Sequence, residues 1–430
     1  MSAPAPIKKA DAVRVGVFDQ VVSGGGVRFF TLKLLEEFSR LSAGGWHFHL
    51  MWPLFDSSDK FLAAPRLGHV SFERISLDTR ARARNVALPA LRKVAGRAAR
   101  WALYEEEVRR GEQRSLRAGD GRGLRWLDER ADEFDLIYLP YPYLTLPGAG
   151  GWRPKKPLVI TLHDLAHEET DAWGDLTEPL RREVPRWARL ADLVIFSSDY
   201  VKREAQKLYG LPEERARRIH LAPAKLENSD GPDARARHGL TGKYVFTLGW
   251  AAKHKRVDTI VEGFALFKRR TGADVALVVA GPRTETLTAG DTHGLEVGRD
   301  LFALGYVADE DIPALYRDAE AVVTASVSEA GLNAMIFDAM SCGRPVICSN
   351  IPQFVERLGT DDALALTFDP HSPQSLAAAF ARHFAEPARA ESRARAAKKF
   401  IDSRTLSDVG REYLAAFKSV LVKSAPGESA

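Results

Sequence analysis

The sequence of 430 residues has only two cysteines, Cys342 and Cys348, and these lack the spacing and the Cys or His partners of a metal site. We therefore expect two reduced thiols in a core. No apolar run reaches the roughly 18 residues that a membrane-spanning helix needs, and the polar start MSAPAPIKKADA lacks the apolar core of a secretion signal. These absences predict a soluble, cytoplasmic protein.

The sequence also lacks a large excess of either charge, because 61 Lys and Arg nearly balance 57 Asp and Glu and the formal net charge is only +4. The excess is local, since the segment 80–125 holds 13 Lys and Arg against 5 Asp and Glu. Pro89 interrupts this segment, and the run Glu105, Glu106 and Glu107 opposes adsorption to anionic lipid, which favours a solvated helical insertion. The alternative is peripheral binding of this segment to the inner face of the membrane. A nucleic-acid partner is not expected.

The length predicts two domains, because single hydrophobic cores stop growing near roughly 250–300 residues. Strand-like apolar runs alternate with helix-like segments in two series. The first contains VRVGVFD, DLIYLPYPY, KPLVITLHD and ADLVIFSSD, and the second contains KYVFTLGW, ADVALVVAGP, LFALGYV, EAVVTAS and PVICSN. A polar passage rich in proline and glycine joins the series near residue 223. This α/β pattern predicts two doubly wound parallel sheets that face an interdomain cleft.

Ligands of such sheets bind at the carboxyl ends of strands, where helix N-termini offer free N–H groups. Gly24, Gly25 and Gly26 follow the first strand and would let the backbone approach a phosphate or a sugar. His163 follows the run LVITL and so stands at another strand end. A glycine turn is also an ordinary strand-to-helix connection, and a lone histidine is usually structural. Position is therefore what makes these residues candidates.

Three cationic residues, Lys253, Lys255 and Arg256, follow the strand YVFTLGW and precede an amphipathic helix. Cations at the start of a helix oppose its dipole, so their position calls for an anionic ligand. A pyrophosphate leaving group fits, because lysine and arginine neutralise the charge that develops on it. The alternative is a solvated first turn.

The stretch SVSEAGLNAMIFDAMSCGRPVICSN, residues 326–350, combines a strand end, a turn and a helix that ends at Gly343. Glu329 in the turn would lie at the cleft, and Asp338 on the helix would reach a pair of ribose hydroxyls. The alternative is that both acids only stabilise the helix dipole. Amides of the turn are candidates for holding an anion, namely those of Gly331, Leu332 and Asn333.

Together these residues resemble the retaining glycosyltransferases of family 4, which have the GT-B fold of two Rossmann-like domains. The resemblance is strongest from Tyr244 to Glu356, and the N-terminal part matches more loosely, through SGGGVR, TLHDL and ADLVIFSSDYVKREA. It implies an acceptor-side domain over 1–222 and a nucleotide-sugar-binding domain over 223–403. It also implies that a terminal helix over 404–423 crosses back onto the first domain.

The resemblance implies a role for each candidate residue. His163 and Glu329 would lie at the donor sugar and Lys255 at its phosphates, so these three are the expected catalytic residues. One departure is that eight residues separate Glu329 from Asp338, whereas the family's E-x7-E motif has seven. The expected donor-binding residues are Gly24, Gly25, Gly26, Lys253, Arg256, Tyr306, Val307, Gly331, Leu332, Asn333 and Asp338.

The activity implied by the resemblance is transfer of a hexosyl unit, mannosyl or glucosyl, from a nucleotide-diphosphate sugar to a glycan or lipid-linked glycan. Configuration would be retained, and polysaccharide biosynthesis is the expected setting. Lysine and helix amides would stabilise the leaving diphosphate, so neither a cofactor nor a metal is expected. Three alternatives stay open: a nucleotide-sugar epimerase, a phosphorylase with a cofactor lysine, and a non-catalytic nucleotide-sugar-binding scaffold.

Overall fold

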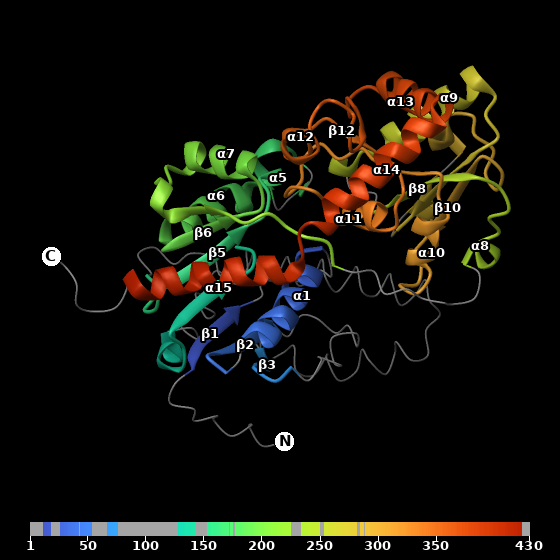
Figure 1. Ribbon diagram of the computed structural model, residues 1–430. Helices are drawn as coiled ribbons and strands as arrows, with labels where there is room; N and C mark the ends of the chain where they lie inside the picture. The colour runs from blue at the N-terminus through green and yellow to red at the C-terminus, as the bar shows by residue number, and fades with distance from the viewer. Residues whose placement is uncertain are drawn as a thin grey trace, which may run out of the picture.

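The computed structural model describes residues 12–18, 26–42, 44–53, 67–75, 128–142, 153–171, 173–174, 177–224, 234–249, 253–281, 284–287 and 289–423. These residues form two α/β domains, one above the other in Figure 1, each built on one parallel sheet. The basic segment 80–125 lies outside the described residues, and so do Gly24 and Gly25. Gly26 is the first residue of the first helix, α1 (Gly26–Leu41).

The N-terminal domain is built on a seven-stranded sheet in the order β3-β2-β1-β4-β5-β6-β7, and all of its pairs are parallel. The order runs outward from the centre in both directions, which is the doubly wound arrangement. Every residue of LVITL in β5 is buried, as expected for a strand covered on both faces. The strands are β1 (Val13–Phe18), β2 (Trp46–Pro53), β3 (Val70–Ile75), β4 (Leu136–Leu139), β5 (Leu158–Leu162), β6 (Leu193–Phe196) and β7 (Ala216–Arg218).

The C-terminal domain repeats this plan with a six-stranded parallel sheet in the order β10-β9-β8-β11-β12-β13. Its central strands β8, β9 and β11 are again largely apolar and buried. The carboxyl ends of β8 and β11 are neighbours, which brings the loops after them together. The strands are β8 (Tyr244–Leu248), β9 (Ala276–Ala280), β10 (Leu301–Gly305), β11 (Ala321–Thr324), β12 (Val346–Ser349) and β13 (Leu366–Phe368).

Helices connect the strands and cover the faces of both sheets (Figure 1). The end residues of α7 show why it stops where it does: the Ser198 side chain accepts the Val201 N–H, and Gly210 ends the helix at φ 67°. Besides α1 the helices are α5 (Ala166–Glu169), α6 (Thr177–Leu190), α7 (Asp199–Tyr209), α8 (Ala234–Arg237), α9 (Val257–Thr271), α10 (Ile312–Arg317), α11 (Ala334–Ser341), α12 (Pro352–Leu358), α13 (Pro373–Ala385), α14 (Pro387–Asp402) and α15 (Leu406–Lys423).

The last helix, α15, follows the C-terminal domain in sequence but packs on the N-terminal one (Figure 1). Its Phe417 ring meets the Phe38 ring of α1 edge-on, with centroids 5.8 Å apart. Its Tyr413 hydroxyl lies 3.1 Å from the Thr161 hydroxyl on β5. The apolar face of α15 is therefore part of the N-terminal core.

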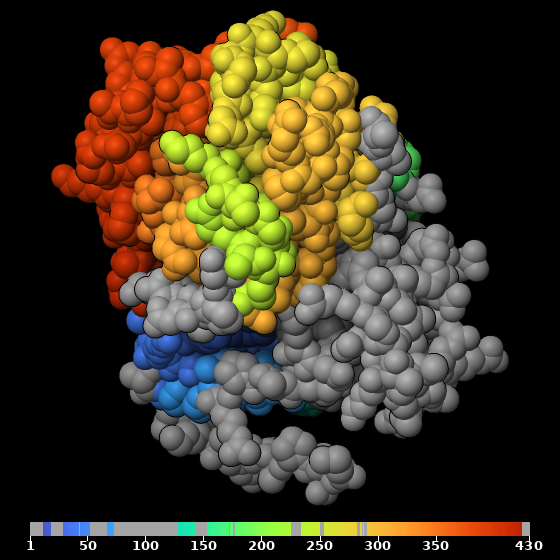
Figure 2. All heavy atoms as spheres, turned by 90° about the vertical axis from the view of Figure 1, so that its right-hand side faces the viewer, coloured from blue at the N-terminus to red at the C-terminus, as the bar shows by residue number. Residues whose placement is uncertain are grey.

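The short helix α8 lies on the surface of the C-terminal domain, where it is light green in Figure 2. Arg237 and His238 both donate to Asp311, the His238 Nε2 atom from 3.0 Å. The hydrogen bond from Arg237, together with that from His238, holds the pKa of Asp311 below its usual value. These bonds fasten the start of the C-terminal domain to the loop before α10.

The predicted fold class, two doubly wound parallel sheets, is confirmed. Both cysteines are free thiols, as predicted: Cys348 is fully buried in β12, and Cys342 is partly buried just after α11. Among the described residues, no helix combines the length and the apolarity that crossing a bilayer requires.

Candidate active site

A lysine and a glutamate form the centre of the candidate site, at the carboxyl edge of the C-terminal sheet. Lys255 ends a short 3-10 helix, Lys253–Lys255, after β8, and Glu329 lies between β11 and α11. The Lys255 Nζ atom is 2.5 Å from Glu329 Oε1, and 29% and 11% of the two side chains are exposed. The Val327 N–H donates to the His254 carbonyl oxygen at 2.9 Å and so joins the two loops.

Asn333 holds this pair in place from the start of α11. Its Oδ1 accepts the Ile336 N–H at 3.1 Å, and its Nδ2 donates to Glu329 Oε1 at 2.9 Å. Burial by itself would raise the pKa of Glu329, but the charge and hydrogen bond of Lys255 outweigh it. Bonds from Asn333 and Ser326 act in the same direction, so the Glu329 pKa lies below its ordinary value. Glu329 is therefore an anion with a fixed position.

The turn between Glu329 and Asn333 touches the N-terminal domain. A Cβ atom on Gly331 would lie 3.2 Å from the Ser197 carbonyl oxygen, so the two backbones approach closely here. Leu332 is 2% exposed and packs with Ile336 in the C-terminal core. Leu332 can therefore offer a ligand only its backbone.

His163 lies directly after β5 and faces several aromatic and polar groups. Its Nδ1 atom is 2.9 Å from the Ser197 Oγ atom, and the Phe30 ring meets its ring edge-on with centroids 5.6 Å apart. Its Nε2 atom is buried and has no hydrogen-bond partner among the described residues. Burial lowers the pKa of His163 to about 4, so the ring is neutral at pH 7.

Asp164 shows that the two domains bring their charged groups within electrostatic reach of each other. Burial raises the pKa of Asp164 to about 6, against a hydrogen bond from the Ala166 N–H. The charge of Glu329 raises it further and that of Lys255 lowers it. The strand end that carries His163 therefore lies near the Lys255 and Glu329 pair.

The other two predicted cations do not join this pair. Lys253 is exposed at the start of the 3-10 turn. Arg256 has φ 47°, in the left-handed region that favours glycine, and its Nη2 atom lies 3.0 Å from Asp258 Oδ2. Its Nη1 atom lies 3.4 Å from His371 Nδ1. The Arg256 guanidinium is thus engaged with α9 and with the loop after β13.

Tyr306 and Val307 follow β10, two strands away from β8 at the same edge of the sheet. Tyr306 is 38% exposed, whereas Val307 is 4% exposed and packs in the core. A ligand at this edge can meet the Tyr306 ring and the backbone of both residues. Their assignment to the nucleobase stays a prediction.

Asp338 lies on α11 in a different environment from Glu329. Burial raises its pKa to about 7, and its charge raises the pKa of Tyr316 and Cys342. The Tyr316 hydroxyl is buried and has no hydrogen-bond partner among the described residues. Among the described residues, no hydrogen bond or ion pair joins Asp338 to Lys255 or Glu329. The structure thus groups Asp338 with Tyr316.

Three polar residues at the site were not among the predicted residues. Asp164 and Ser197 follow β5 and β6, so the strand-end rule that selected His163 also applies to them. Glu356, on α12, accepts hydrogen bonds from the first turn of α7 in the other domain. No local pattern indicates that contact, because it joins residues 157 positions apart.

A cavity of about 580 Å³ lies at the opposite, amino-terminal edge of the C-terminal sheet. Its lining includes Lys268 and Arg269. Lys268 lies 2.6 Å from Asp300, and Arg269 donates to the His293 carbonyl oxygen at 2.8 Å. Because ligands of such sheets bind at the carboxyl ends of the strands, we do not place the active site at this edge.

Two family models match the chain. Glycosyl transferases group 1 matches residues 232–400, which include Lys255 and Glu329, and Glycosyltransferase Family 4 matches residues 102–222, which include His163. Together the two models match more than half of the chain.

Similar curated proteins are bacterial glycosyltransferases. O-antigen chain mannosyltransferase B of Escherichia coli is 29% identical over 196 residues, which are 44% of this chain and 50% of that protein. D-inositol 3-phosphate glycosyltransferase of Salinispora arenicola is 28% identical over 281 residues, which are 59% of this chain and 61% of that protein. The chain thus spans between half and about three fifths of the length of these relatives.

Solved structures with the same fold cover nearly the whole chain. Anabaena HepE in complex with UDP and glucose superposes with a TM-score of 0.65 at 18% identity, over 95% of this chain and 100% of that chain. Sucrose-phosphate synthase from Thermosynechococcus elongatus superposes with a TM-score of 0.66 at 17% identity, over 96% and 100%. The two family models show that the chain belongs to the group 1 and family 4 glycosyltransferases, and the solved structures show that it has the GT-B fold.

Proposed function

We propose that this protein transfers a hexosyl unit from a nucleotide-diphosphate sugar to a hydroxyl acceptor with retention of configuration. The observation that carries the proposal is the partly exposed Lys255 ammonium, held 2.5 Å from Glu329 at the carboxyl edge of the C-terminal sheet. Relatives that are named mannosyltransferases, and a fold neighbour solved with UDP-glucose, support this class of donor. The proposed sugar is mannosyl or glucosyl, and the proposed acceptor is a glycan or lipid-linked glycan.

Lys255 is proposed to stabilise the leaving diphosphate. Negative charge grows on the phosphate oxygens as the bond to the sugar breaks, so a fixed cation lowers the barrier more than it strengthens ground-state binding. The ammonium has three donors, of which Glu329 uses one in the described structure. The remaining donors are available to phosphate oxygens while Glu329 keeps the lysine in position.

His163 is proposed to contact the transferred sugar. Its Nδ1 atom is already engaged with Ser197, whereas its buried Nε2 atom has no partner among the described residues. A sugar hydroxyl would satisfy that nitrogen. Because the ring is neutral, it positions the sugar without adding a charge beside the leaving group.

In the proposed step, the acceptor oxygen forms its bond to the anomeric carbon on the face from which the diphosphate departs. The electron pair of the broken carbon–oxygen bond goes to the phosphate oxygen, which takes the proton of the acceptor hydroxyl. No enzyme nucleophile takes part. Lys255 supplies the positive charge at the diphosphate, so the proposal uses neither a metal nor a cofactor.

The proposal is tested by nucleotide binding to the full chain. UDP and GDP are added to the wild type, to Lys255→Ala and to Lys207→Ala, which removes an exposed lysine on α7. A ligand at about 100 times its Kd stabilises the folded form by about 2.7 kcal/mol, so one nucleotide should raise the Tm of the wild type and of Lys207→Ala by several degrees. Lys255→Ala should lose most of that rise and most turnover with UDP- or GDP-sugars. Equal stabilisation of all three proteins would contradict the proposal.

A further inference from the structure

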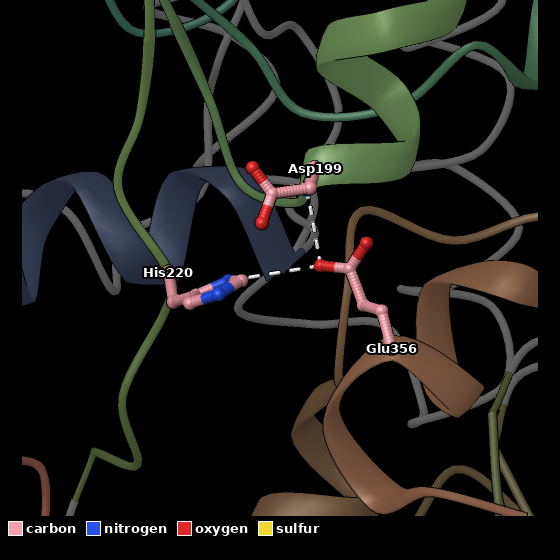
Figure 3. Close-up of side chains that lie close together, drawn as sticks. All are labelled: Asp199, His220 and Glu356. Atoms are coloured by element: carbon pink, nitrogen blue, oxygen red, sulfur yellow. Dashed lines mark hydrogen bonds and ion pairs between the residues drawn. The ribbon is translucent and has the colours of Figure 1, made fainter.

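The two domains meet where α12 of the C-terminal domain approaches the start of α7 in the N-terminal domain. Glu356 on α12 accepts the Asp199 N–H at 3.0 Å with Oε1 and the Tyr200 N–H at 2.9 Å with Oε2. Figure 3 shows its carboxylate directed at the first residue of α7. The first N–H groups of a helix have no partner within the helix, so Glu356 caps a helix that belongs to the opposite domain.

This cap completes the hydrogen bonding of the first turn of α7. The Ser198 side chain accepts the Val201 N–H at 3.3 Å, and the next N–H, of Lys202, is bonded within the helix. Glu356 therefore satisfies the two N–H groups that remain, with a charged acceptor that also suits the positive end of the helix dipole. The Glu356 side chain is 15% exposed, so water could make only part of these hydrogen bonds if the carboxylate were removed.

Ser197 lies directly before Ser198, the N-cap residue of α7, and connects the start of this helix to the candidate site. The Ser197 Oγ atom lies 2.9 Å from His163 Nδ1, and the Ser197 carbonyl oxygen accepts from His220 Nδ1 at 3.2 Å. The same carbonyl oxygen abuts Gly331 of the C-terminal domain. Ser197 is 1% exposed and bonds directly to the His163 ring, so a shift of the turn would change this contact.

A metal ion is the other explanation for this cluster, because ligand atoms of Asp199, His220 and Glu356 lie within 4.8 Å of one another. The hydrogen bonds account for the arrangement without an ion. Both Glu356 oxygens accept N–H groups, and His220 Nδ1 carries a proton for the Ser197 carbonyl oxygen. His220 Nδ1 is also 3.8 Å from Glu356 Oε1, which is longer than a hydrogen bond (Figure 3).

We propose that Glu356 is a positioning residue for the glycosyl transfer: by capping α7 across the domain boundary it fixes the Ser197 turn, which orients the His163 ring. The bonds of Glu356 exist only when the domains stand as they do here. Assembly of the site in the N-terminal domain is thus linked to the position of the C-terminal domain. This inference rests on the function proposed above for His163.

The test compares steady-state transfer by the full-length wild type with Glu356→Ala, Glu356→Gln and Ser197→Ala. We expect the first variant to lower kcat tenfold or more, because a misplaced contact group costs roughly ten- to a hundredfold, with the donor KM within about twofold. Glu356→Gln keeps one acceptor oxygen, so its kcat should lie between those of Glu356→Ala and the wild type. Ser197→Ala should act like Glu356→Ala, and the double variant should be no slower than the slower single variant, since both act through one contact.

Glu204→Ala is the matched control, because it removes a glutamate of α7 that pairs only loosely with Lys207, at 3.9 Å. It should leave kcat unchanged. The rise in Tm with UDP or GDP should be equal in all variants, because Lys255, the proposed contact to the diphosphate, is unchanged in each of them. An unchanged kcat in Glu356→Ala, or single losses that multiply in the double variant, would overturn the inference. If Glu356→Ala does not fold, Glu356→Gln and Ser197→Ala decide in the same way.

If the wild type binds neither nucleotide, the proposed function is wrong, and this inference is wrong with it. A wild type that binds and transfers, together with variants at position 356 that do so equally well, would overturn this inference alone.

Discussion

Replacing Lys255 and Glu329 singly and together separates two roles of the lysine, which are to neutralise Glu329 and, as proposed, to bind the diphosphate. Lys255→Met leaves the Glu329 carboxylate 11% exposed, with hydrogen bonds from Asn333 and Ser326. Breaking a buried ion pair lowers the free energy of unfolding by about 3–5 kcal/mol, and an exposed pair contributes about 0.2–1 kcal/mol. Lys255 is 29% exposed, so its removal should lower the free energy of unfolding by about 2 kcal/mol. That loss corresponds to a fall in Tm of roughly 4–8 °C.

Glu329→Gln keeps an acceptor for Asn333 and leaves a lysine that can reach water, so its loss should be below about 1 kcal/mol. The double variant should regain most of the stability that Lys255→Met loses. Turnover behaves differently, because removing one stabilising donor from a transition state costs about 10²–10³ in kcat. The double variant should therefore stay as slow as Lys255→Met.

The assay is a double-mutant cycle in both Tm and kcat, with Tm measured also as a function of pH. The folded-state pKa of Glu329 is lowered from 4.5, so the stability from the pair is present above pH 4.5 and is lost as the pH falls through the lowered value. The difference in Tm between wild type and Lys255→Met should shrink over that range. Recovery of kcat in the double variant would refute the reasoning, because it would show that the lysine serves only Glu329.

Two further predictions concern other residues of the site and its framework. Asp164 has a pKa of about 6, whereas that of His163 is about 4, so an ionisation near pH 6 in the pH profile of kcat belongs to Asp164. This ionisation should disappear in Asp164→Asn, and its persistence in that variant would contradict the assignment. Gly281→Ala should destabilise the fold by about 3 kcal/mol or more, because φ is +125° and a Cβ would lie 2.1 Å from the Gly249 carbonyl oxygen. Gly239→Ala, with φ +68° and open space around it, should cost only about 1–2 kcal/mol, and equal Tm values for both variants would count against this account.

The sequence allowed the fold to be predicted because its central strands are apolar on both faces. Runs such as LVITL and ALVVA are buried throughout, which leaves few alternatives to a covered parallel sheet. The strands that the patterns did not indicate, such as β2, β3 and β7, carry polar residues, as WHFHLMWP and ARR show. These strands owe their pairing to their neighbours in the sheet more than to a pattern of their own.

The meeting of Lys255 with Glu329 was predictable in outline, because each follows a strand and parallel strands share a carboxyl edge. The direction of a side chain was not. Arg256 has the same local context as Lys255, yet its guanidinium contacts Asp258, and Asp338 lies beside Tyr316. The direction of each side chain depends on neighbouring residues that only the folded chain brings together.

The candidate site is divided between the domains, so neither domain alone holds all of the proposed site residues. The C-terminal domain supplies the Lys255 ammonium and the carboxylate that keeps it in place, and the N-terminal domain supplies a neutral His163 whose second nitrogen lacks a partner among the described residues. Because the charge of Lys255 affects the ionisation of Asp164, next to His163, the two halves already act on each other in this arrangement. A rotation of one domain would change that electrostatic contact and the cap by Glu356 at the same time. Residues that fix the distance between the domains should therefore control turnover as strongly as residues that touch the substrates.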